Sequence, residues 1–138
     1  MATNRWMRIG DLAERTGTTP QTIRYYEQIG LLVPTEREGR GYRYYNEEAV
    51  ARLHKIAALK QIGLSLEEIR EVIDLYFTDA TGIQGKRKVL EILKRHRDET
   101  DEKMATLQRF RSELDQNIAR VEGLIRAIER KQAHPESE

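Results

Sequence analysis

The sequence contains no cysteine, which excludes disulfide bonds, thiolate metal sites and redox sensing through thiols. Its three histidines, His54, His96 and His134, do not have the spacing of metal ligands. We therefore predict that the protein holds no metal and no cofactor. No acid pair, nucleophile–base set or phosphate-binding loop is visible either, so we do not expect an enzyme.

Long hydrophobic runs are also missing. No segment approaches the roughly 20 apolar residues that span a membrane. The N-terminal residues lack the apolar centre of a signal peptide. These features predict no membrane partner and a cytoplasmic location. Hydrophobic residues make up 38% of the chain and charged residues 34%, which is typical of a helical protein with much solvated surface.

Proline is absent from the stretch between Lys86 and Lys131, and its one glycine is Gly123. The stretch predicts a single helix of roughly 70 Å. Apolar residues recur along it at steps of three and four, interrupted by Arg97, Thr100 and Arg111. One isolated helix cannot bury so narrow a stripe, so we predict that the protein is a homodimer. The residues expected at its seam are Leu107, Leu114, Ile118, Val121, Ile125 and Ile128.

The same patterns divide the chain into four segments. Residues 6–77 are expected to form a compact domain, and residues 86–131 the coiled-coil dimerisation helix. Residues 78–85 have two glycines and no hydrophobic period, so we assign them to a hinge. Residues 132–138 are expected to form a disordered tail.

The compact domain begins with two short helices. The first covers residues 8–17 and ends at Gly17, which suits a left-handed residue. Thr19 then caps the second helix, and Pro20 takes its first position, where no N–H is needed. This helix runs to Ile29 and stops at Gly30. Two short helices joined by a tight glycine-containing turn predict a helix-turn-helix unit.

The faces of the second helix follow from its period. Ile23, Tyr26 and Ile29 share one stripe and should pack inward. The residues on the other side of this helix are of the types that contact base edges and phosphates in the major groove. They are Gln21, Thr22, Arg24, Tyr25 and Gln28. A plain solvated surface is the alternative, and this helix alone does not decide between the two.

A β-hairpin is expected directly after this helix. Leu31–Val33 predicts one strand, residues 41–45 a second strand, and the polar residues 34–40 the connection. A hairpin in this place is a wing. Arg40, Tyr42 and Arg43 are of the types that bind phosphates, although the arginines alternatively remain solvated. Between Arg37 and Lys60 the chain has six basic residues and three acidic ones, a local basic surface.

Two further helices complete the domain. Asn46 caps one, whose buried stripe we predict as Val50, Leu53, Ile56, Ala57 and Leu59. A capping box, Ser65 to Glu68, opens the next, which should run to Tyr76. Lys60 lies near a helix end and could reach a phosphate. For Arg52 and Lys55, simple solvation on the outer surface is an alternative of at least equal weight to a phosphate contact.

Five motifs together resemble the MerR family of bacterial transcription regulators. They are Ile9–Ala13, Thr19–Glu27, Ile29–Leu32, Gly41–Tyr45 and Ile62–Ile69. The resemblance implies a mainly α fold, with a winged helix-turn-helix DNA-binding domain, a small β-hairpin wing and a long C-terminal helix that forms an antiparallel coiled-coil dimer. The DNA contacts that it implies fall on Thr22, Arg24, Tyr25, Arg40, Tyr42, Arg43 and Lys60.

The resemblance also implies a mechanism. Family members bind, as dimers, an inverted repeat in promoter DNA whose spacer is unusually long, and they bend and untwist it so that RNA polymerase can start. Contacts at both half-sites must offset a deformation cost of several kcal/mol. Similarity to regulators of branched-chain amino-acid and fatty-acid catabolism points to an acyl-CoA-like metabolite as effector. The alternative is a structural DNA-binding or partner-docking protein that does not switch promoters.

Overall fold

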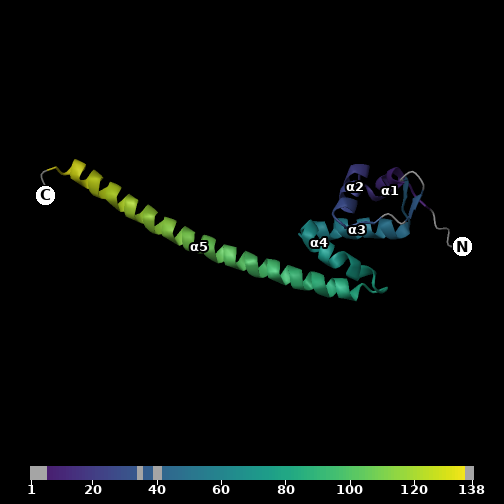
Figure 1. Ribbon diagram of the computed structural model, residues 1–138. Coiled ribbons are helices and arrows are strands. Elements are labelled where there is room, and N and C mark those ends of the chain that lie inside the picture. Colours follow the sequence, from purple (N-terminus) through teal and green to yellow (C-terminus); the bar gives the residue numbers. More distant parts are fainter. Residues whose placement is uncertain (1–5, 34–35, 39–41, 136–138) are drawn as a thin grey trace. The chain divides into compact units, whose positions relative to one another are not determined.

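The computed structural model describes residues 6–33, 36–38 and 42–135. Contacts divide the chain into two compact units, Met1–Ile92 and Leu93–Glu138, which we call the body and the distal helix. The elements of the body are α1 (Ile9–Thr16), α2 (Pro20–Gln28), β1 (Glu36–Glu38), β2 (Tyr42–Tyr44), α3 (Glu47–Gln61), α4 (Leu66–Val72) and the 3₁₀ helix η1 (Ile73–Phe77). Helix α5 (Ile83–Ala133) begins in the body and supplies the distal helix (Figure 1). The fold is mainly helical, as predicted.

The local signals for the helix ends are confirmed. Gly17 ends α1 with φ at 72°. Thr19 accepts a hydrogen bond of 3.1 Å from the backbone N–H of Thr22, and Pro20 opens α2. Asn46 caps α3 by accepting from the N–H of Glu48. The capping box of α4 is complete, since Ser65 and Glu68 each accept from the other's backbone N–H. Each of these side chains accepts a hydrogen bond from a backbone N–H that has no partner within its helix, which stabilises the helix by about 1 kcal/mol.

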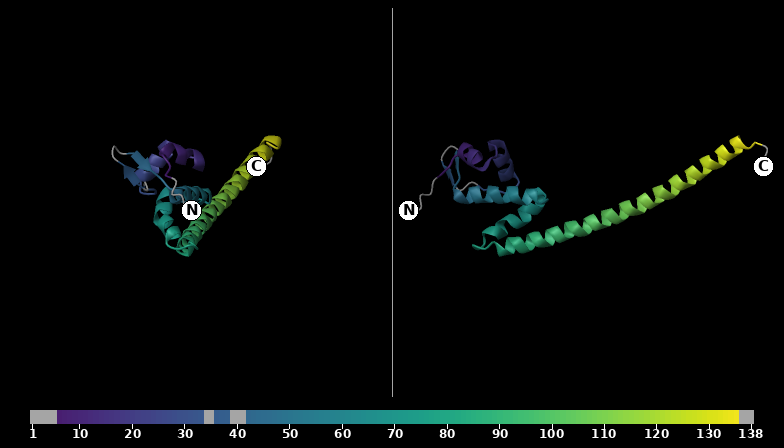
Figure 2. Two further views of the ribbon diagram at one scale, coloured as in Figure 1. Left: turned by 90° about the vertical axis from the view of Figure 1, so that its right-hand side faces the viewer. Right: turned by 180° about the vertical axis from the view of Figure 1, so that it is seen from behind.

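The core of the body lies where α1 packs on both α2 and α3, with α4 and η1 on the other side of α3 (Figures 1 and 2). Leu12, Ile23, Leu53 and Ile69 are buried to within 2% of their surface. Two residues of the first turns of α5, Val89 and Ile92, are buried in the same unit. Burying one such side chain stabilises the fold by about 1.5–3 kcal/mol.

The wing differs from its prediction at its first strand. Strand β1 begins at Glu36, pairs antiparallel with β2, and places Arg37 opposite Arg43. The expected strand at Leu31–Val33 is wrong, because Leu31 and Leu32 are both fully buried. In a half-buried strand successive side chains point to opposite faces, so two adjacent buried leucines instead mark a chain entering the core.

One further boundary and one burial prediction differ within the body. Helix α4 ends at Val72 and continues as the 3₁₀ helix η1, where the sequence predicts one helix to Tyr76. Tightening of the last turn is common at helix ends. The prediction that Ala57 is buried is also wrong: Ala57 is exposed, because the stripe on α3 runs through Leu53, Ile56 and Leu59 and leaves it outside.

The segment assigned to a hinge is shorter than expected, because α5 already begins at Ile83. Asp79 accepts hydrogen bonds from the N–H groups of Thr81 (2.8 Å) and Gly82 (2.9 Å) and from the Thr81 hydroxyl (2.7 Å). These bonds, from the Thr81 hydroxyl first and then the backbone, lower the pKa of Asp79. Thr81 in turn accepts from the N–H of Ile83 at 3.2 Å. Residues 79–82 thus form a hydrogen-bonded turn into the helix.

The first turn of α5 packs tightly on Tyr76. A Cβ on Gly85 would lie 2.7 Å from two ring carbons of Tyr76, closer than real side chains come. The ammonium of Lys55 lies 4.5 Å and that of Lys86 5.6 Å from the centre of the same ring. Partial burial raises the pKa of Tyr76. Gly85 therefore lies in the first turn of the helix against the ring, and not in the hinge to which its segment was assigned.

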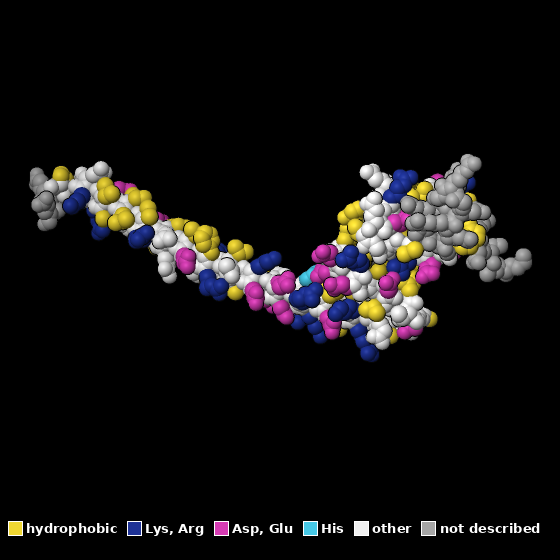
Figure 3. Space-filling view, viewed as in Figure 1, with side chains coloured by type: hydrophobic (Ala, Val, Ile, Leu, Met, Phe, Trp, Pro, Cys, Tyr) yellow, Lys and Arg dark blue, Asp and Glu magenta, His cyan; other side chains and the backbone are white. Residues whose placement is uncertain are grey.

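The distal helix buries none of its described residues. Hydrophobic side chains gather along one side of it (Figure 3). The large exposed ones are Met104, Leu107, Phe110, Leu114, Ile118, Val121, Leu124, Ile125 and Ile128. A soluble single helix gains nothing from such a stripe, so this surface lacks a partner in the isolated chain.

Candidate nucleic-acid interface

The outward face of α2 gathers the residues expected to contact DNA. Ile23 and Tyr26 point into the core and are 0% and 5% exposed, while Arg24 and Tyr25 are exposed. A shallow surface hollow is lined by the outward residues, namely Gln21, Thr22, Arg24, Tyr25 and Gln28. The structure thus brings the four predicted α2 contacts onto one surface, with Gln28 beside them. This set offers a guanidinium, two amides and two hydroxyls to a groove.

Helix α2 is held from its own C-terminal end. Arg70 of α4 donates a hydrogen bond of 3.3 Å to the carbonyl of Ile29, one of the groups that a helix end leaves open. The hydroxyl of Tyr45 donates to the carboxylate of Glu27. Because Tyr45 is fully buried at the end of the wing, this bond ties the wing to α2.

The base of the wing is fixed to the N-terminal segment as well. Met7 and Tyr45 exchange two backbone hydrogen bonds, of 2.7 and 2.8 Å. The backbones of Tyr42 and Arg43 lie in β2, but their side chains are not described. Arg40 lies outside the described residues. The phosphate contacts of the wing therefore remain predictions. The backbone next to β2 is held by the hydrogen bonds between Met7 and Tyr45.

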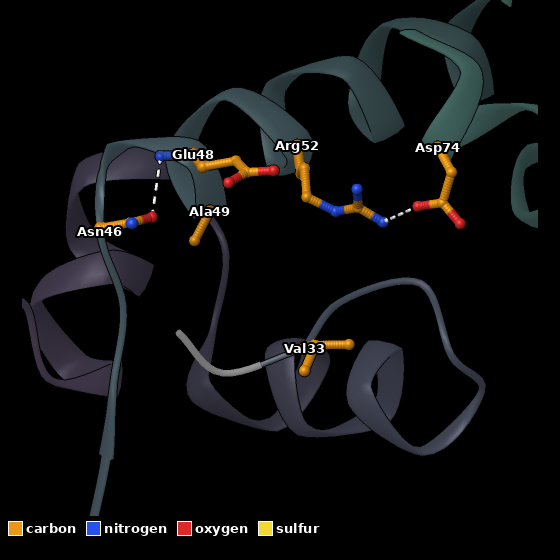
Figure 4. Close-up of a pocket in the computed structure, with 6 residues that line it drawn as sticks. All are labelled: Val33, Asn46, Glu48, Ala49, Arg52 and Asp74. Carbon is orange, nitrogen blue, oxygen red and sulfur yellow. Dashed lines mark hydrogen bonds and ion pairs between the residues drawn. The ribbon is translucent and has the colours of Figure 1, made fainter. Parts of the chain in front are cut away.

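The basic surface between Arg37 and Lys60 is smaller than the sequence indicates. The alternative that Arg52 is simply solvated is wrong: its guanidinium donates to the carbonyl of Leu31 at 3.2 Å and to Asp74 at 2.8 Å, and 14% of its side chain is exposed. Figure 4 shows Arg52 reaching from α3 to Asp74 beside a pocket of about 220 Å³. The pocket is lined by Val33, Asn46, Glu48, Ala49, Arg52 and Asp74.

The ammonium of Lys55 likewise contacts the ring of Tyr76, whereas Lys60 is exposed in the last turn of α3. Arg15 of α1 pairs with Glu47 of α3 through two hydrogen bonds, and this hydrogen bonding raises the pKa of Arg15. Arg15 and Arg52 thus join elements of the body. Lys60 and Arg24 remain as cations exposed on the described part of the body's α3 and α2.

Sequence reasoning missed the residues that position this surface. The bonds from Tyr45 to Glu27 and from Arg70 to Ile29 join residues 18 and 41 positions apart in the chain. No periodic pattern links such residues. A buried tyrosine beside a helix glutamate has no local signature, although the match of both residues to family motifs was a usable signal.

A metal site and a membrane span find no support in the described residues. No group of three or more His, Asp or Glu side chains there could hold a metal ion. No helix in the described part of the chain is long and apolar enough to cross a membrane.

Comparison with known families settles the relationship that the geometry indicates. Residues 7–75 match the family model described as "MerR HTH family regulatory protein", and residues 50–117 match "MerR, DNA binding". The chain belongs to the MerR family.

Relatives of known annotation agree with this membership. The HTH-type transcriptional regulator YfmP of Bacillus subtilis is 33% identical over 138 residues, which cover 90% of this chain and 99% of YfmP. The nodulation protein NolA of Bradyrhizobium elkanii is 41% identical over 109 residues, 78% of this chain and 45% of NolA. This MerR-family chain thus spans less than half the length of the NolA proteins that it matches.

Among solved structures, the transcription regulator PbrR691 from Ralstonia metallidurans, crystallised with lead(II), has a TM-score of 0.60 and 29% identity. The match covers 75% of this chain and 80% of PbrR691. The present chain contains no cysteine.

Proposed function

We propose that this MerR-family chain is a sequence-specific transcription regulator that binds promoter DNA as a homodimer. The observation that carries the proposal is the outward face of α2, where Gln21, Thr22, Arg24 and Tyr25 line one surface and none of them serves the core. Residues of these types read base edges and hold phosphates. Its family membership and its likeness to YfmP support the same role.

The proposed mechanism requires two copies of this surface in one dimer. A dimer presents two copies of α2 and of the wing to the two halves of an inverted repeat. Arg40, Tyr42, Arg43 and Lys60 are the proposed phosphate contacts outside α2. By binding both half-sites, the dimer bends and untwists the promoter. RNA polymerase in the cytoplasm can then initiate transcription. The cost of deforming the DNA is of order 1–6 kcal/mol, which a single copy with half the contacts cannot meet.

Arginine substitutions test the proposed contacts. Arg24→Ala and Arg43→Ala should each weaken binding to the protein's own promoter by about tenfold or more, because each removes a contact worth about 1–3 kcal/mol. Arg109→Ala on the distal helix is the matched control and should leave affinity unchanged. The measurement is a binding titration at several salt concentrations, with sedimentation to verify that the oligomeric state is retained. Wild-type affinity for both body variants would refute these contacts.

A transcription assay separates this function from a docking protein that binds DNA without switching promoters. With purified RNA polymerase and the protein's own promoter, transcription should depend on the protein and on spacer length. Shortening the spacer by about two base pairs should make the promoter independent of the protein. If the protein binds both promoters and changes transcription from neither, the docking alternative stands.

A further inference from the structure

The chain between α2 and β1 is held by arginines from two other helices. The guanidinium of Arg52, in α3, donates a hydrogen bond of 3.2 Å to the carbonyl of Leu31. Arg70, in α4, donates one of 3.3 Å to the carbonyl of Ile29, at the end of α2. Arg70 thus holds the end of the helix proposed to read base edges, and Arg52 holds the residues that lead from it into the wing.

Arg52 connects this segment to a third element, the 3₁₀ helix η1. The same nitrogen, Nη2, also donates to the carboxylate of Asp74 at 2.8 Å, and the guanidinium carbon lies 5.4 Å from the centre of the Phe77 ring. A guanidinium suits this place because it is planar, always charged and presents several N–H donors in fixed directions. One side chain therefore fixes the approach to the wing relative to η1.

Side-chain packing on this segment ends beside Arg52. Leu31 and Leu32 are buried, but the next residue, Val33, is 72% exposed. Val33 lines the pocket of about 220 Å³ together with Arg52 and Asp74 (Figure 4). Because side chains do not fill the space beside Val33, packing does not fix the chain beyond Leu32. The hydrogen bonds of Arg52 lie at the edge of this space and supply a directional restraint that packing does not.

We infer that Arg52 is a positioning residue for the wing. Because its guanidinium is bonded to Leu31 and Asp74, it does not serve as a phosphate contact. It holds the approach to the wing in place, so that the contacts proposed for Arg40 and Arg43 start from a defined position. This inference rests on the proposed function and adds a residue outside the set that contacts DNA. Holding a binding element in its bound position lowers the entropic cost of binding.

Lys55 supplies a matched control on the same helix. Its ammonium lies 4.5 Å from the centre of the Tyr76 ring, so its described contact joins α3 to η1 and does not involve the residues that lead into the wing. Arg52→Ala and Lys55→Ala therefore each remove one cation that contacts η1. Only Arg52→Ala also frees the approach to the wing.

A double-mutant cycle on promoter binding tests the role of Arg52. Arg52→Ala should weaken affinity for the protein's own promoter by about fivefold, because a wing that is not positioned must be ordered during binding. In the background Arg40→Ala/Arg43→Ala, which lacks the two proposed arginine contacts of the wing, the effect should fall below about twofold. In the background Arg24→Ala, on α2, it should keep its full size. Lys55→Ala should leave the affinity of the wild type unchanged.

Hydrogen exchange of the free protein gives a second measurement that involves no DNA. The amides of residues 31–33 and 36–38 should exchange several-fold faster in Arg52→Ala than in the wild type. They should exchange at the wild-type rate in Lys55→Ala. Amides in the middle of α3 should be unchanged in both variants, which verifies that the body remains folded.

Asp74→Ala keeps the inference testable if Arg52→Ala does not fold. The side chain of Asp74 is 81% exposed, so its removal does not disturb the core. The variant leaves Arg52 in place and removes its bond to η1. We expect the same pattern in the cycle and in the exchange of residues 31–33 and 36–38, with a smaller effect in each.

Two outcomes would overturn the inference. An equal loss from Arg52→Ala in all three backgrounds would show that Arg52 stabilises the body in general and not the wing. Wild-type affinity or wild-type exchange in both Arg52→Ala and Asp74→Ala would show that the approach to the wing does not need Arg52.

The inference and the proposed function can fail separately. If Arg24→Ala and Arg40→Ala/Arg43→Ala bind the promoter as the wild type does, the proposed DNA contacts are lost. Hydrogen exchange in the free protein then still measures whether Arg52 holds the approach to the wing. If these variants bind weakly and the effect of Arg52→Ala is additive with both, the proposed function stands and the positioning role of Arg52 is lost.

Discussion

The body and the distal helix use the same residue types in opposite ways. Leu53 and Ile69 in the body are 2% and 0% exposed, whereas Leu107 and Ile118 in the distal helix are 66% and 54% exposed. The apolar contacts of the body are completed within one chain. Those of the distal helix need a second molecule, so their contribution to stability depends on protein concentration. In the proposed function, recognition of DNA and assembly of the dimer thus rest on separate sets of contacts.

The largest expected effect comes from a charge in the stripe. Ile118→Asp should abolish the dimer, because pairing would bury an unpaired carboxylate from each copy at a cost of several kcal/mol. The body should remain folded. Gln116→Asp, on the opposite side of the helix, is the control and should remain dimeric. Sedimentation velocity reports assembly, and hydrogen exchange of body amides reports its fold. A dimeric Ile118→Asp protein would show that the seam lies elsewhere.

Removing one leucine from each region compares them directly. Leu53→Ala should lower the free energy of unfolding of the body by about 2–5 kcal/mol, because it leaves a cavity in a packed core. This loss should be the same at low and high protein concentration. Leu107→Ala should weaken only the dimer, so its effect should vanish at concentrations where the wild type is monomeric. Urea unfolding at two protein concentrations measures both, and a concentration-dependent loss for Leu53→Ala would contradict the division.

Glycine substitutions test how α5 begins in the body and continues in the distal helix. Gly85→Ala should destabilise the protein by about 1–3 kcal/mol, because the new methyl group meets the ring of Tyr76. Gly123→Ala should instead stabilise α5 by about 1 kcal/mol, because its Cβ meets only the end of Arg126, at 4.0 Å. Thermal unfolding of the two variants should therefore shift in opposite directions. Equal stabilisation by both would show that Tyr76 moves aside freely.

The smallest effect is expected at the turn into α5. The pKa of Asp79 is lowered in the folded state, so its charge stabilises the fold above the pKa of the unfolded chain, and this contribution is lost as pH falls through the folded value. Asp79→Asn keeps an acceptor oxygen and removes the charge. The variant should be slightly less stable than the wild type at neutral pH and equal to it near pH 2. Thermal unfolding between these pH values measures whether the stabilities of the variant and the wild type converge. A constant difference in stability would show that the geometry of the turn, and not the charge of Asp79, causes the effect.

The short-range parts of the fold were predictable because their causes are short-range. Thr19, Asn46 and the pair Ser65–Glu68 cap helices through bonds that span two or three residues, so the sequence alone locates them. The outward residues of α2 followed from one helical period. The strand expected at Leu31–Val33 failed because an apolar run looks the same in a strand and in a segment entering a core.

Long-range contacts account for what could not be predicted. For Arg52 the sequence left solvation and a phosphate contact open, yet the carbonyl of Leu31 and the carboxylate of Asp74 hold it from 21 and 22 residues away. Gly85 was assigned to the hinge, but it lies in α5, and Tyr76 occupies the space that its missing side chain leaves. In both cases the partner lies on another element, and only the packing of those elements brings the two together.

The sequence by itself determined the helix-turn-helix, the outward set on α2 and the apolar stripe of the distal helix. These depend on period and on neighbours a few residues away, which the order of residues specifies directly. The tertiary structure alone decided which cations remain exposed and how the wing and the start of α5 are fastened. Those depend on groups far apart in the chain meeting at hydrogen-bonding or van der Waals distance, which only the packed core sets.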